Sequence, residues 1–304
     1  MGGGGNMIRV LTENDYVSVQ AHLNQDPLHN IYLIHGLQTY GLASDLVTFW
    51  GAFDDDRLAG VLFADNEDTP RCGFLAGDDP EVLARLGKFA RKSGIGKLIG
   101  ISEYIQPVVD SLPSRVPTVV LHLDFYETHP GQLVPSYRYP VRSATEEDVP
   151  LLVELYKHCE LYTRNHQTEQ EIEHKIRKVM GESGVYFLAE WEGRALSAAQ
   201  VAPEIDEAGV IDSATTLPEF RGRGMYYCVR TACLEYLFGR GKIGLSVIRG
   251  SNASVKRVVA KTGGSCTAQW LIVKFTKKPP LRRRILPLWL RRWGLQMLGR
   301  EVTE

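Results

Sequence analysis

Two stretches of the chain repeat one pattern of apolar and polar positions. The first runs from Ile8 to Asp15 and the second from Val141 to Asp148. Each begins with residues that suit a short strand and continues with Thr-x-x-Asp, starting at Thr12 and at Thr145. A threonine hydroxyl can cap a helix while the acid three residues later reaches back to the threonine amide. The pattern therefore predicts, twice, a short strand that leads into a capped helix.

A hairpin pattern follows each of these stretches at a similar distance. Acidic or glycine-containing turns between apolar runs are typical of hairpins. In the first copy the turn is Asp54–Arg57, between Phe49–Phe53 and Leu58–Phe63; in the second it is Glu192–Arg194, between Tyr186–Trp191 and Ala195–Val201. Self-similarity over this distance indicates two copies of one α/β unit in tandem. A segment rich in proline and tyrosine, residues 130–140, joins them.

Apolar residues recur at a spacing of three to four in two further stretches of the second copy. They are Leu151, Leu152 and Leu155 in the first stretch and Ile172, Ile176 and Val179 in the second. This period predicts helices over about Glu147–Glu160 and Thr168–Glu182.

A turn with two glycines lies between a predicted strand and a predicted helix. The apolar, threonine-rich segment Gly209–Leu217 favours a strand, and a helical run follows from Met225 to Gly239. Gly222 and Gly224 allow successive backbone N–H groups to point into one concavity. The start of the helix adds unpaired N–H groups and a positive dipole end, and the rim carries Arg221 and Arg223. Such a turn predicts a cradle for a phosphate or pyrophosphate; the alternative is a tight connection with solvated arginines.

This turn and the segments after it resemble the acyl-CoA signature of the GCN5-related N-acetyltransferases, the GNAT superfamily. The turn has the spacing Arg221-x-x-Gly224 after Pro218–Phe220. A second apolar strand follows at Gly244–Val247, and then come Asn252–Val255 and Lys261–Gly264. They match, in order and distance, the family's Asn-x-x-Ala/Ser…Tyr-x-Lys-x-Gly-Phe stretch. The resemblance covers roughly residues 141–273, and the repeat extends it to residues 1–139 because family domains begin with a strand and a helix.

The resemblance implies an α/β chain with a mixed (α+β) sheet, built from two tandem GNAT-like domains and a basic C-terminal tail. We expect the first domain to be degenerate, because acids stand where its phosphate turn should be, in Leu75–Glu81, and would repel a pyrophosphate. That domain would have a structural or substrate-shaping role. The expected boundaries are a flexible start at 1–6, domains at 7–129 and 141–275, a linker at 130–140 and a tail at 276–304.

The resemblance also implies acetyl-CoA as the acyl donor, without a metal. The pantetheine arm would pair with the strand edge at Ser213–Leu217, where the backbone N–H of Thr216 would meet the thioester carbonyl. Asn252 would reach the pantetheine arm; its alternative role is to cap the helix that follows, and the two roles can coexist. The expected cofactor-binding residues are thus Thr216, Arg221, Gly222, Arg223, Gly224, Met225 and Asn252.

Three positions depart from the family pattern. Tyr226 stands where the family has glycine or alanine, and Gly264 where it has an aromatic residue. Val259 stands where the family has the tyrosine that often protonates the leaving CoA thiolate. Valine has no proton to donate, so another group or a water must act as the acid. Tyr226 is the candidate, against the alternative that it packs in the core.

The acceptor of the acyl group, a primary amine, is protonated at neutral pH and must lose a proton to a base or a water chain. Asp212 is the candidate base, because it precedes Thr216 by four residues and strand alternation would place both side chains on one face. The alternative is an acid in a salt bridge at a strand end. The polar and aromatic segment 161–167 stands where the family has a loop that closes over the acceptor, and it equally suits an ordinary helix connection.

Composition and charge limit the remaining questions. The chain has 304 residues, of which 44% are hydrophobic and 23% charged, as in an ordinary globular protein. Its five cysteines form no Cys-x-x-Cys pair, which favours reduced thiols and a cytoplasmic location. No histidine cluster has the spacing of metal ligands. The first residues carry no signal pattern and no apolar run approaches ~18 residues, so we expect no membrane span.

Positive charge is concentrated in the C-terminal tail. Residues 274–304 carry nine lysines and arginines and two glutamates, a net charge of +7 that leaves −8 for the rest of the chain. Residues 277–298 combine this charge with Trp289 and Trp293. The combination suits an anionic membrane surface or RNA phosphates with stacked bases. The alternative is a helix that packs on the protein itself.

The leading hypothesis for function is an acetyl-CoA-dependent N-acetyltransferase that acts by direct attack on a small primary amine, such as an amino acid, a polyamine or an aminoglycoside-like molecule. A rival is an acyltransferase of the same fold that takes its acyl group from aminoacyl-tRNA or an acyl carrier protein. The missing tyrosine, Tyr226 and the basic tail favour this rival, whereas the turn from Arg221 to Gly224 disfavours it. A third hypothesis is a non-catalytic sensor of acyl-CoA.

Overall fold

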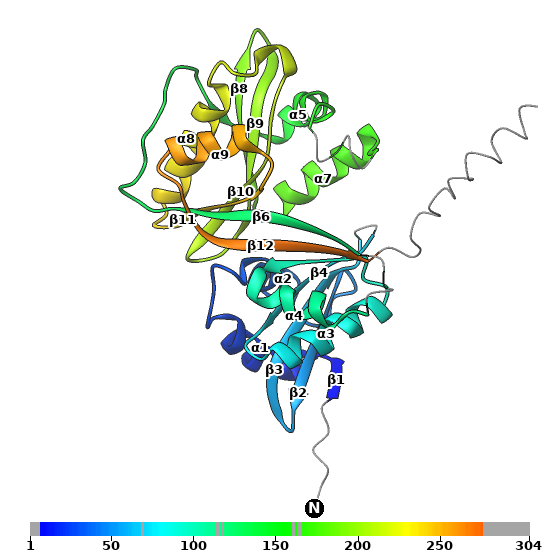
Figure 1. Ribbon diagram of the computed structural model, residues 1–304. Coiled ribbons are helices and arrows are strands. Elements are labelled where there is room, and N and C mark those ends of the chain that lie inside the picture. The colour runs from blue at the N-terminus through cyan, green and yellow to red at the C-terminus, as the bar shows by residue number, and fades with distance from the viewer. Residues whose placement is uncertain are drawn as a thin grey trace, which may run out of the picture.

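A single sheet of twelve strands runs through the described part of the chain, with helices packed on both faces (Figure 1). The computed structural model describes residues 7–67, 70–113, 116, 118–159, 162 and 166–275. The expected flexible start at 1–6 and the tail at 276–304, with its predicted membrane or RNA contacts at 277–298, lie outside these residues. Within the described ranges, no helix has both the length and the apolar character that crossing a membrane requires.

Both halves of the chain contain strands and helices. The strands are β1 (Met7–Val10), β2 (Val47–Asp54), β3 (Arg57–Asp65), β4 (Cys72–Gly77), β5 (Lys97–Ile101), β6 (Thr118–Thr128), β7 (Arg142–Ser143), β8 (Val185–Trp191), β9 (Arg194–Glu204), β10 (Ala208–Thr216), β11 (Ile243–Arg249) and β12 (Ser265–Phe275). The helices are α1 (Tyr16–Leu23), α2 (Ile31–Tyr40), α3 (Pro80–Lys92), α4 (Ser102–Ser111), α5 (Val149–Tyr156), α7 (Glu169–Gly181), α8 (Met225–Phe238) and α9 (Ala253–Lys261).

The repeat predicted from the sequence is confirmed at its two capped starts. In the first copy, the guanidinium of Arg9 donates two hydrogen bonds of 2.8 and 2.7 Å to Asp15. In the second, Arg142 donates two of 2.7 Å to Asp148. Each aspartate also accepts a hydrogen bond from the threonine amide three residues earlier, which closes the capping box. The same local interaction therefore fixes the start of both copies, and the predicted mixed α/β sheet and both predicted hairpins are confirmed as well.

The last strands of the two halves are exchanged. The spatial order is β1-β2-β3-β4-β5-β12-β6-β11-β10-β9-β8-β7. β12, from the second half, pairs with β5 of the first, and β6, from the first half, pairs with β11 of the second. Phe125 on β6 and Trp270 on β12 stack with ring centroids 5.4 Å apart in a core shared by both halves. In space, the predicted domains 7–129 and 141–275 therefore complete each other's sheet.

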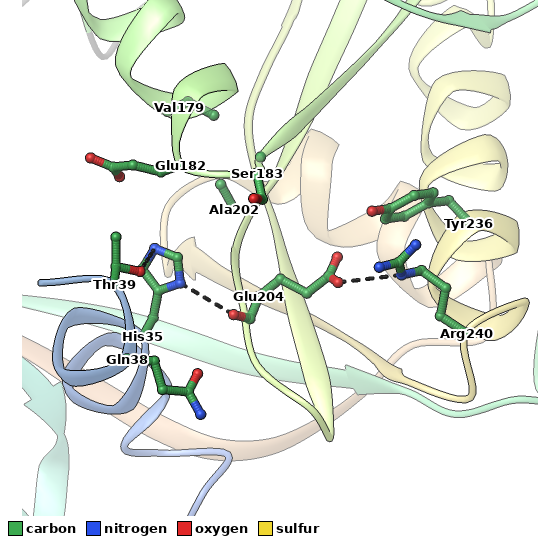
Figure 2. Close-up of a pocket in the computed structure, with 11 residues that line it drawn as sticks. His35, Gln38, Thr39, Val179, Glu182, Ser183, Ala202, Glu204, Tyr236 and Arg240 are labelled. Carbon is green, nitrogen blue, oxygen red and sulfur yellow. Dashed lines mark hydrogen bonds and ion pairs between the residues drawn. The ribbon is translucent and has the colours of Figure 1, made fainter.

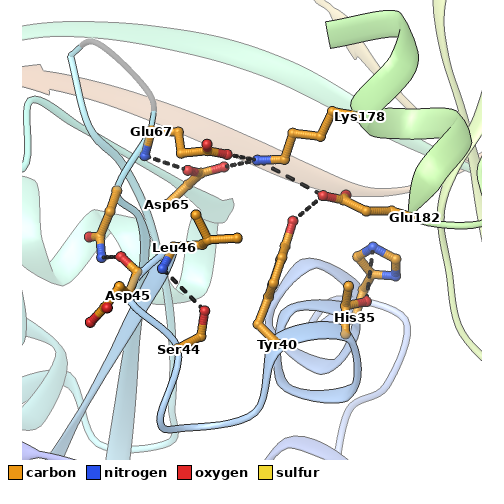
Figure 3. A network of polar contacts seen from close by, with 11 residues as sticks. His35, Tyr40, Ser44, Asp45, Leu46, Asp65, Glu67, Lys178 and Glu182 are labelled. Carbon is orange, nitrogen blue, oxygen red and sulfur yellow. Dashed lines mark hydrogen bonds and ion pairs between the residues drawn. The ribbon is translucent and has the colours of Figure 1, made fainter. Parts of the chain in front are cut away.

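A polar network also joins α7 of the second half to the first half (Figure 3). The ammonium of Lys178 lies 2.6 Å from Glu67 and 3.5 Å from Asp65. Glu182 accepts a hydrogen bond from the hydroxyl of Tyr40 on α2. Burial opposes the charge of Lys178, but the hydrogen bond to Glu67 and the charge of Asp65 outweigh it and raise the pKa of Lys178. The network holds α7, and with it the start of the β8–β9 hairpin, against the first half.

We predict that Asp148→Asn destabilises the fold in a pH-dependent way. The hydrogen bonds from Arg142, aided by the Thr145 amide, lower the pKa of Asp148 from 3.8 to about 2. Because this pKa is lowered in the folded state, its stabilisation is fully present above pH ~4 and is lost as pH falls toward ~2. At pH ~7 the free energy of unfolding should fall by about 1–2 kcal/mol, measured by chemical denaturation.

The matched control is Asp206→Asn, which changes an exposed aspartate between β9 and β10. Its unfolding free energy should stay within about 0.5 kcal/mol of the wild type. An Asp148→Asn variant as stable as this control at neutral pH would contradict the role assigned to the capping box.

Candidate functional site

The candidate site begins where two parallel strands separate. β10 and β11 pair only from Ala208 to Val210, opposite Ile243–Leu245. Beyond Val210, β10 continues to pair with β9 on its other side. The register with β9 shifts between Asp212 and Thr215, and Ser213 adopts a positive φ of 53°. This bulge re-aims the strand, so that the edge from Ile211 to Thr216 has no β11 partner among the described residues. An unpaired strand edge is free to bond an amide-bearing chain.

The amide of Thr216 points toward this opening. The Leu217 amide donates a 2.9 Å hydrogen bond to Leu196 of β9. Because successive amides of a strand point to opposite sides, the N–H of Thr216 faces away from β9. Its carbonyl oxygen, on the same side, accepts a 3.1 Å hydrogen bond from Nε of Arg221. The geometry is therefore compatible with the predicted contact between Thr216 and a thioester carbonyl.

The glycine turn after β10 leaves a row of backbone amides open. The amides of Phe220 and Arg221 donate back to Leu217 and Pro218. The next six, from residue 222 to residue 227, find no acceptor in the part of the chain that the structure describes. Gly222 and Gly224 have φ values of 75° and 87°, and a Cβ on either would meet nothing within 4 Å. The turn therefore presents several N–H groups and the start of α8 to an uncrowded space, as an anion cradle requires.

The two arginines at the rim of the turn are exposed. Arg221 is turned back to the carbonyl of Thr216, and the guanidinium of Arg223 lies 5.2 Å from the ring centre of Phe220. Both charges stay at the mouth of the cradle, where they raise the local concentration of anions.

Asn252 caps α9, and this helix begins at the same end of the sheet as α8. Its Oδ1 accepts hydrogen bonds from the Val255 amide at 3.3 Å and from the Ser254 hydroxyl at 3.0 Å. The capping role weighed for Asn252 is thus present in the structure. Its Nδ2 has no acceptor among the described residues, so the predicted contact with a pantetheine arm is compatible with the cap.

Asp212 lies on the face of the sheet that α5 covers. It is in register with Gln200 on β9, and Gln200 with Tyr186 on β8, so the three side chains share this face. The predicted alternation of Asp212 with Thr216 is wrong. Because the bulge inserts one residue, Thr215 shares the face of Asp212, and Thr216 points to the opposite face.

Asp212 as a whole residue is exposed, although protein atoms crowd its carboxyl group. This burial raises its pKa above the ordinary value, against the opposing effect of a hydrogen bond from the Ser213 amide. A carboxylate with a raised pKa holds a proton more readily than a free one, which is the property of a base that works near neutral pH. No ion pair with Asp212 forms among the described residues, so the salt-bridge alternative finds no support there.

Several tyrosines lie within the electrostatic influence of Asp212. Besides burial, the charge of Asp212 raises the pKa of each of five tyrosines: Tyr32, Tyr156, Tyr162, Tyr186 and Tyr226. The hydroxyls of Tyr156 and Tyr186 and Oε1 of Gln200 are buried without a hydrogen-bonding partner in the described ranges. Buried polar atoms are nearly always paired, so these three favour a bound polar ligand or water beside Asp212. Tyr32 comes from α2 of the first half, which the sequence analysis did not connect with the site.

Tyr226 is the second residue of α8 and is half-buried. Burial raises its pKa, Arg230 acts in the opposite direction, and Asp212 adds to the increase. The hydroxyl therefore keeps its proton at neutral pH. Tyr226 packs at the edge of a core between α8 and the sheet, as its packing alternative expects, and the charge of Asp212 also acts on it.

The corresponding turn in the first half is closed by a carboxylate. β4 and β5 also pair in parallel over three residues before they separate. Asp79 then caps α3 and accepts a 2.8 Å hydrogen bond from the Glu81 amide. This side chain uses a helix-terminal amide that the second half leaves open, which gives a physical reason for the degenerate first copy.

A polar cavity between the halves lies elsewhere (Figure 2). It has a volume of about 220 Å³ and is lined by His35, Glu182, Glu204 and Arg240, among others. Burial lowers the pKa of His35, whose Nδ1 lies 3.2 Å from the carbonyl oxygen of Glu204. Glu204 precedes the start of β10, whereas the glycine turn follows its end, so this cavity is separate from the candidate site. No group of three or more potential metal ligands occurs in the described ranges.

Solved structures with a similar fold include GNAT proteins of low sequence identity. A GNAT acetyltransferase from Colwellia psychrerythraea aligns with a TM-score of 0.60 at 13% identity, over 89% of this chain and 100% of its own. A tandem GNAT protein from the clavulanic acid biosynthesis pathway aligns with a TM-score of 0.64 at 12% identity, over 90% of this chain and 99% of its own. A GCN5-related N-acetyltransferase from Sphaerobacter thermophilus aligns with a TM-score of 0.61 at 12% identity, over 92% of this chain and 98% of its own. No family model and no curated protein matches the sequence, so the likeness concerns the fold.

We predict that Gly224→Glu abolishes binding of acetyl-CoA. The substitution places a carboxylate in the row of open amides and adds a side chain at a φ of 87°, so both repulsion and strain of about 1–3 kcal/mol oppose the bound state. Isothermal titration should show affinity reduced at least ~100-fold. Gly193→Glu is the matched control, because Gly193 has a φ of 72° and an open surrounding but lies in the β8–β9 turn. Wild-type affinity in Gly224→Glu would refute the cradle.

Proposed function

We propose that this chain, which has the fold of tandem GNAT proteins, is an acetyl-CoA-dependent N-acetyltransferase that acetylates a primary amine of a small molecule by direct attack. The observation that carries the proposal is the row of open amides at 222–227, directly after a strand edge that has lost its partner. An anion cradle joined to an unpaired edge suits a donor with a diphosphate at one end and amide groups along its arm.

The donor would lie along β10. Its diphosphate would meet the amides from Gly222 to Tyr227, including those of Arg223, Gly224 and Met225, and its arm would follow the edge toward Thr216. The N–H of Thr216 would then donate to the thioester carbonyl, where negative charge develops during attack. Nδ2 of Asn252 would donate to an amide oxygen of the arm. These features support a CoA thioester over the rival donors, an acyl carrier protein or aminoacyl-tRNA.

The acceptor would approach from the face that α5 and α2 cover, beside Asp212. An ammonium ion is attracted by a carboxylate and by the faces of aromatic rings, which the tyrosines around Asp212 supply. Asp212 takes one proton from the ammonium, and the free amine attacks the thioester carbon. The new C–N bond forms, the nitrogen gives up its second proton to water, the C–S bond breaks, and the electron pair leaves on sulfur. A proton from Tyr226, or from water, then neutralises the thiolate, and solvent returns a proton to Tyr226.

We predict that Asp212→Asn lowers kcat at pH ~7 by at least ~10-fold, with acetyl-CoA affinity within about 2-fold of the wild type. The raised pKa of Asp212 places the acidic limb of the wild-type rate profile above the ordinary carboxyl range, because the base must be unprotonated to act. The assay is thiol release from acetyl-CoA with a panel of polyamines, amino acids and aminoglycosides. Wild-type kcat across pH in the variant would remove Asp212 from the mechanism.

We also predict that Tyr226→Phe lowers kcat by about 10-fold, because water replaces the phenol as a poorer acid. Acetyl-CoA affinity should stay unchanged, since the backbone amide of residue 226 remains. The control is Tyr227→Phe, which changes the next tyrosine; its hydroxyl is bonded to Val134 and Lys261, both at 3.0 Å. Equal kcat values in the two variants would exclude Tyr226 as the acid.

A further inference from the structure

One buried cation of α8 has no anionic partner. Arg230 is fully buried. Its Nε, Nη1 and Nη2 donate to three hydroxyls: Thr262 at 2.8 Å, Ser246 at 2.8 Å and Thr128 at 3.0 Å. None of the described carboxylates forms an ion pair with it. A buried charge without a counter-ion is costly, and neutral hydroxyls orient the guanidinium without neutralising it.

The hydroxyls hold this charge at the apex of the strand opening. Ser246 follows Leu245, the last residue of β11 that pairs with β10. The Ser246 hydroxyl also lies 3.4 Å from the carbonyl oxygen of Ile211, the first β10 residue beyond the paired segment. Arg230 therefore lies where β10 and β11 part, at the base of the edge that leads to Thr216.

The hydroxyl of Thr262 links Arg230 to the C-terminal end of α9, near Val259. The Thr262 hydroxyl accepts a hydrogen bond from Arg230 and donates one of 2.8 Å to the carbonyl oxygen of Val259. Val259 is fully buried. Val259 is the position where the resemblance places a thiolate-protonating tyrosine. The chain thus lacks an acid on α9 and has a fixed cation on the neighbouring helix.

Tyr226 precedes Arg230 by one helical turn, so the two side chains lie on one face of α8. The charge of Arg230 counteracts the effect of burial on the pKa of Tyr226. The same charge acts on the thiol of Cys233. Burial raises the pKa of this thiol to about 12, and Arg230 acts in the opposite direction. Among the described residues, the charge of Arg230 acts on these two groups, and Asp212 on β10 also acts on Tyr226. The side chains that accept hydrogen bonds from Arg230, at the end of α9, on β11 and on β6, are uncharged hydroxyls.

We propose that Arg230 is a positioning residue that sets a positive potential beneath the strand opening and thereby stabilises the thiolate that leaves the acyl donor. The inference rests on the proposed function. When the C–S bond breaks, the electron pair moves to sulfur, and the guanidinium lowers the energy of that charge through the poorly screened interior. Arg230 transfers no proton; Tyr226 or water supplies it afterwards. The fixed cation thus compensates for the missing acid at Val259.

The test is the ionisation of bound coenzyme A, measured on the full chain with coenzyme A that carries ¹³C beside its sulfur. As the pH is varied, the chemical shift of this carbon reports the ionisation of the coenzyme A thiol and of no other group. In the wild type, the bound thiol should titrate at least about one unit below free coenzyme A. In Arg230→Met its pKa should rise by one unit or more, which is a tenfold loss of thiolate at a given pH. Arg230→Lys keeps a positive charge and should raise the pKa of the bound thiol by less than Arg230→Met.

Arg91→Met, which removes an exposed arginine of α3, is the control and should match the wild type. A bound thiol that titrates like free coenzyme A in the wild type would overturn the inference, even if Arg230→Met fails to fold. An equal thiol pKa in wild type and a folded Arg230→Met would mean that Arg230 only braces α8 against the sheet. Failure of the wild type to bind coenzyme A would instead overturn the proposed function, and this inference with it.

Discussion

The separation of β10 from β11 is the constraint on which the rest of the site depends. The strands part after three paired residues because the bulge at Ser213 re-aims β10 while β9 still holds it. That parting exposes a strand edge and directs the amide of Thr216 into the opening, while the register with Gln200 keeps Asp212 on the face of Tyr186. The glycine turn would be only an anion site without it. With it, the turn becomes one end of the continuous surface on which we propose that an extended donor binds.

The exchange of β6 and β12 makes the second half's sheet depend on the first half. β6 supplies the second neighbour of β11, so the wall of the opening is built from both halves. α2 packs into the shared core and brings Tyr32 near Asp212. The first half has lost an open phosphate turn to Asp79 but still shapes the second half's site. Its expected role, structural or substrate-shaping, is compatible with these contacts.

Local signals could be predicted from the sequence and non-local ones could not. Thr-x-x-Asp at Thr145 and the glycines of the turn specify their backbone within a few residues, so the caps and the open amides followed from the pattern. The bulge did not, because a positive φ at a serine such as Ser213 has no sequence signature; strand alternation therefore placed Thr216 on the wrong face. Tyr32 and Arg230 depend on contacts across the fold, and an arginine on a helix is solvated in most proteins.

The central claim is that the second half alone binds the donor, through backbone amides beside an unpaired strand edge. Its most direct test is a titration of the ¹⁵N-labelled chain with acetyl-CoA, followed by the amide resonances in solution. The account predicts that the largest shifts fall on residues 222–227 and on Thr216, with little change at Asp78 to Glu81 of the first half. Shifts confined to the first half, or an absence of shifts from Thr216 to Tyr227 at saturating acetyl-CoA, would contradict it.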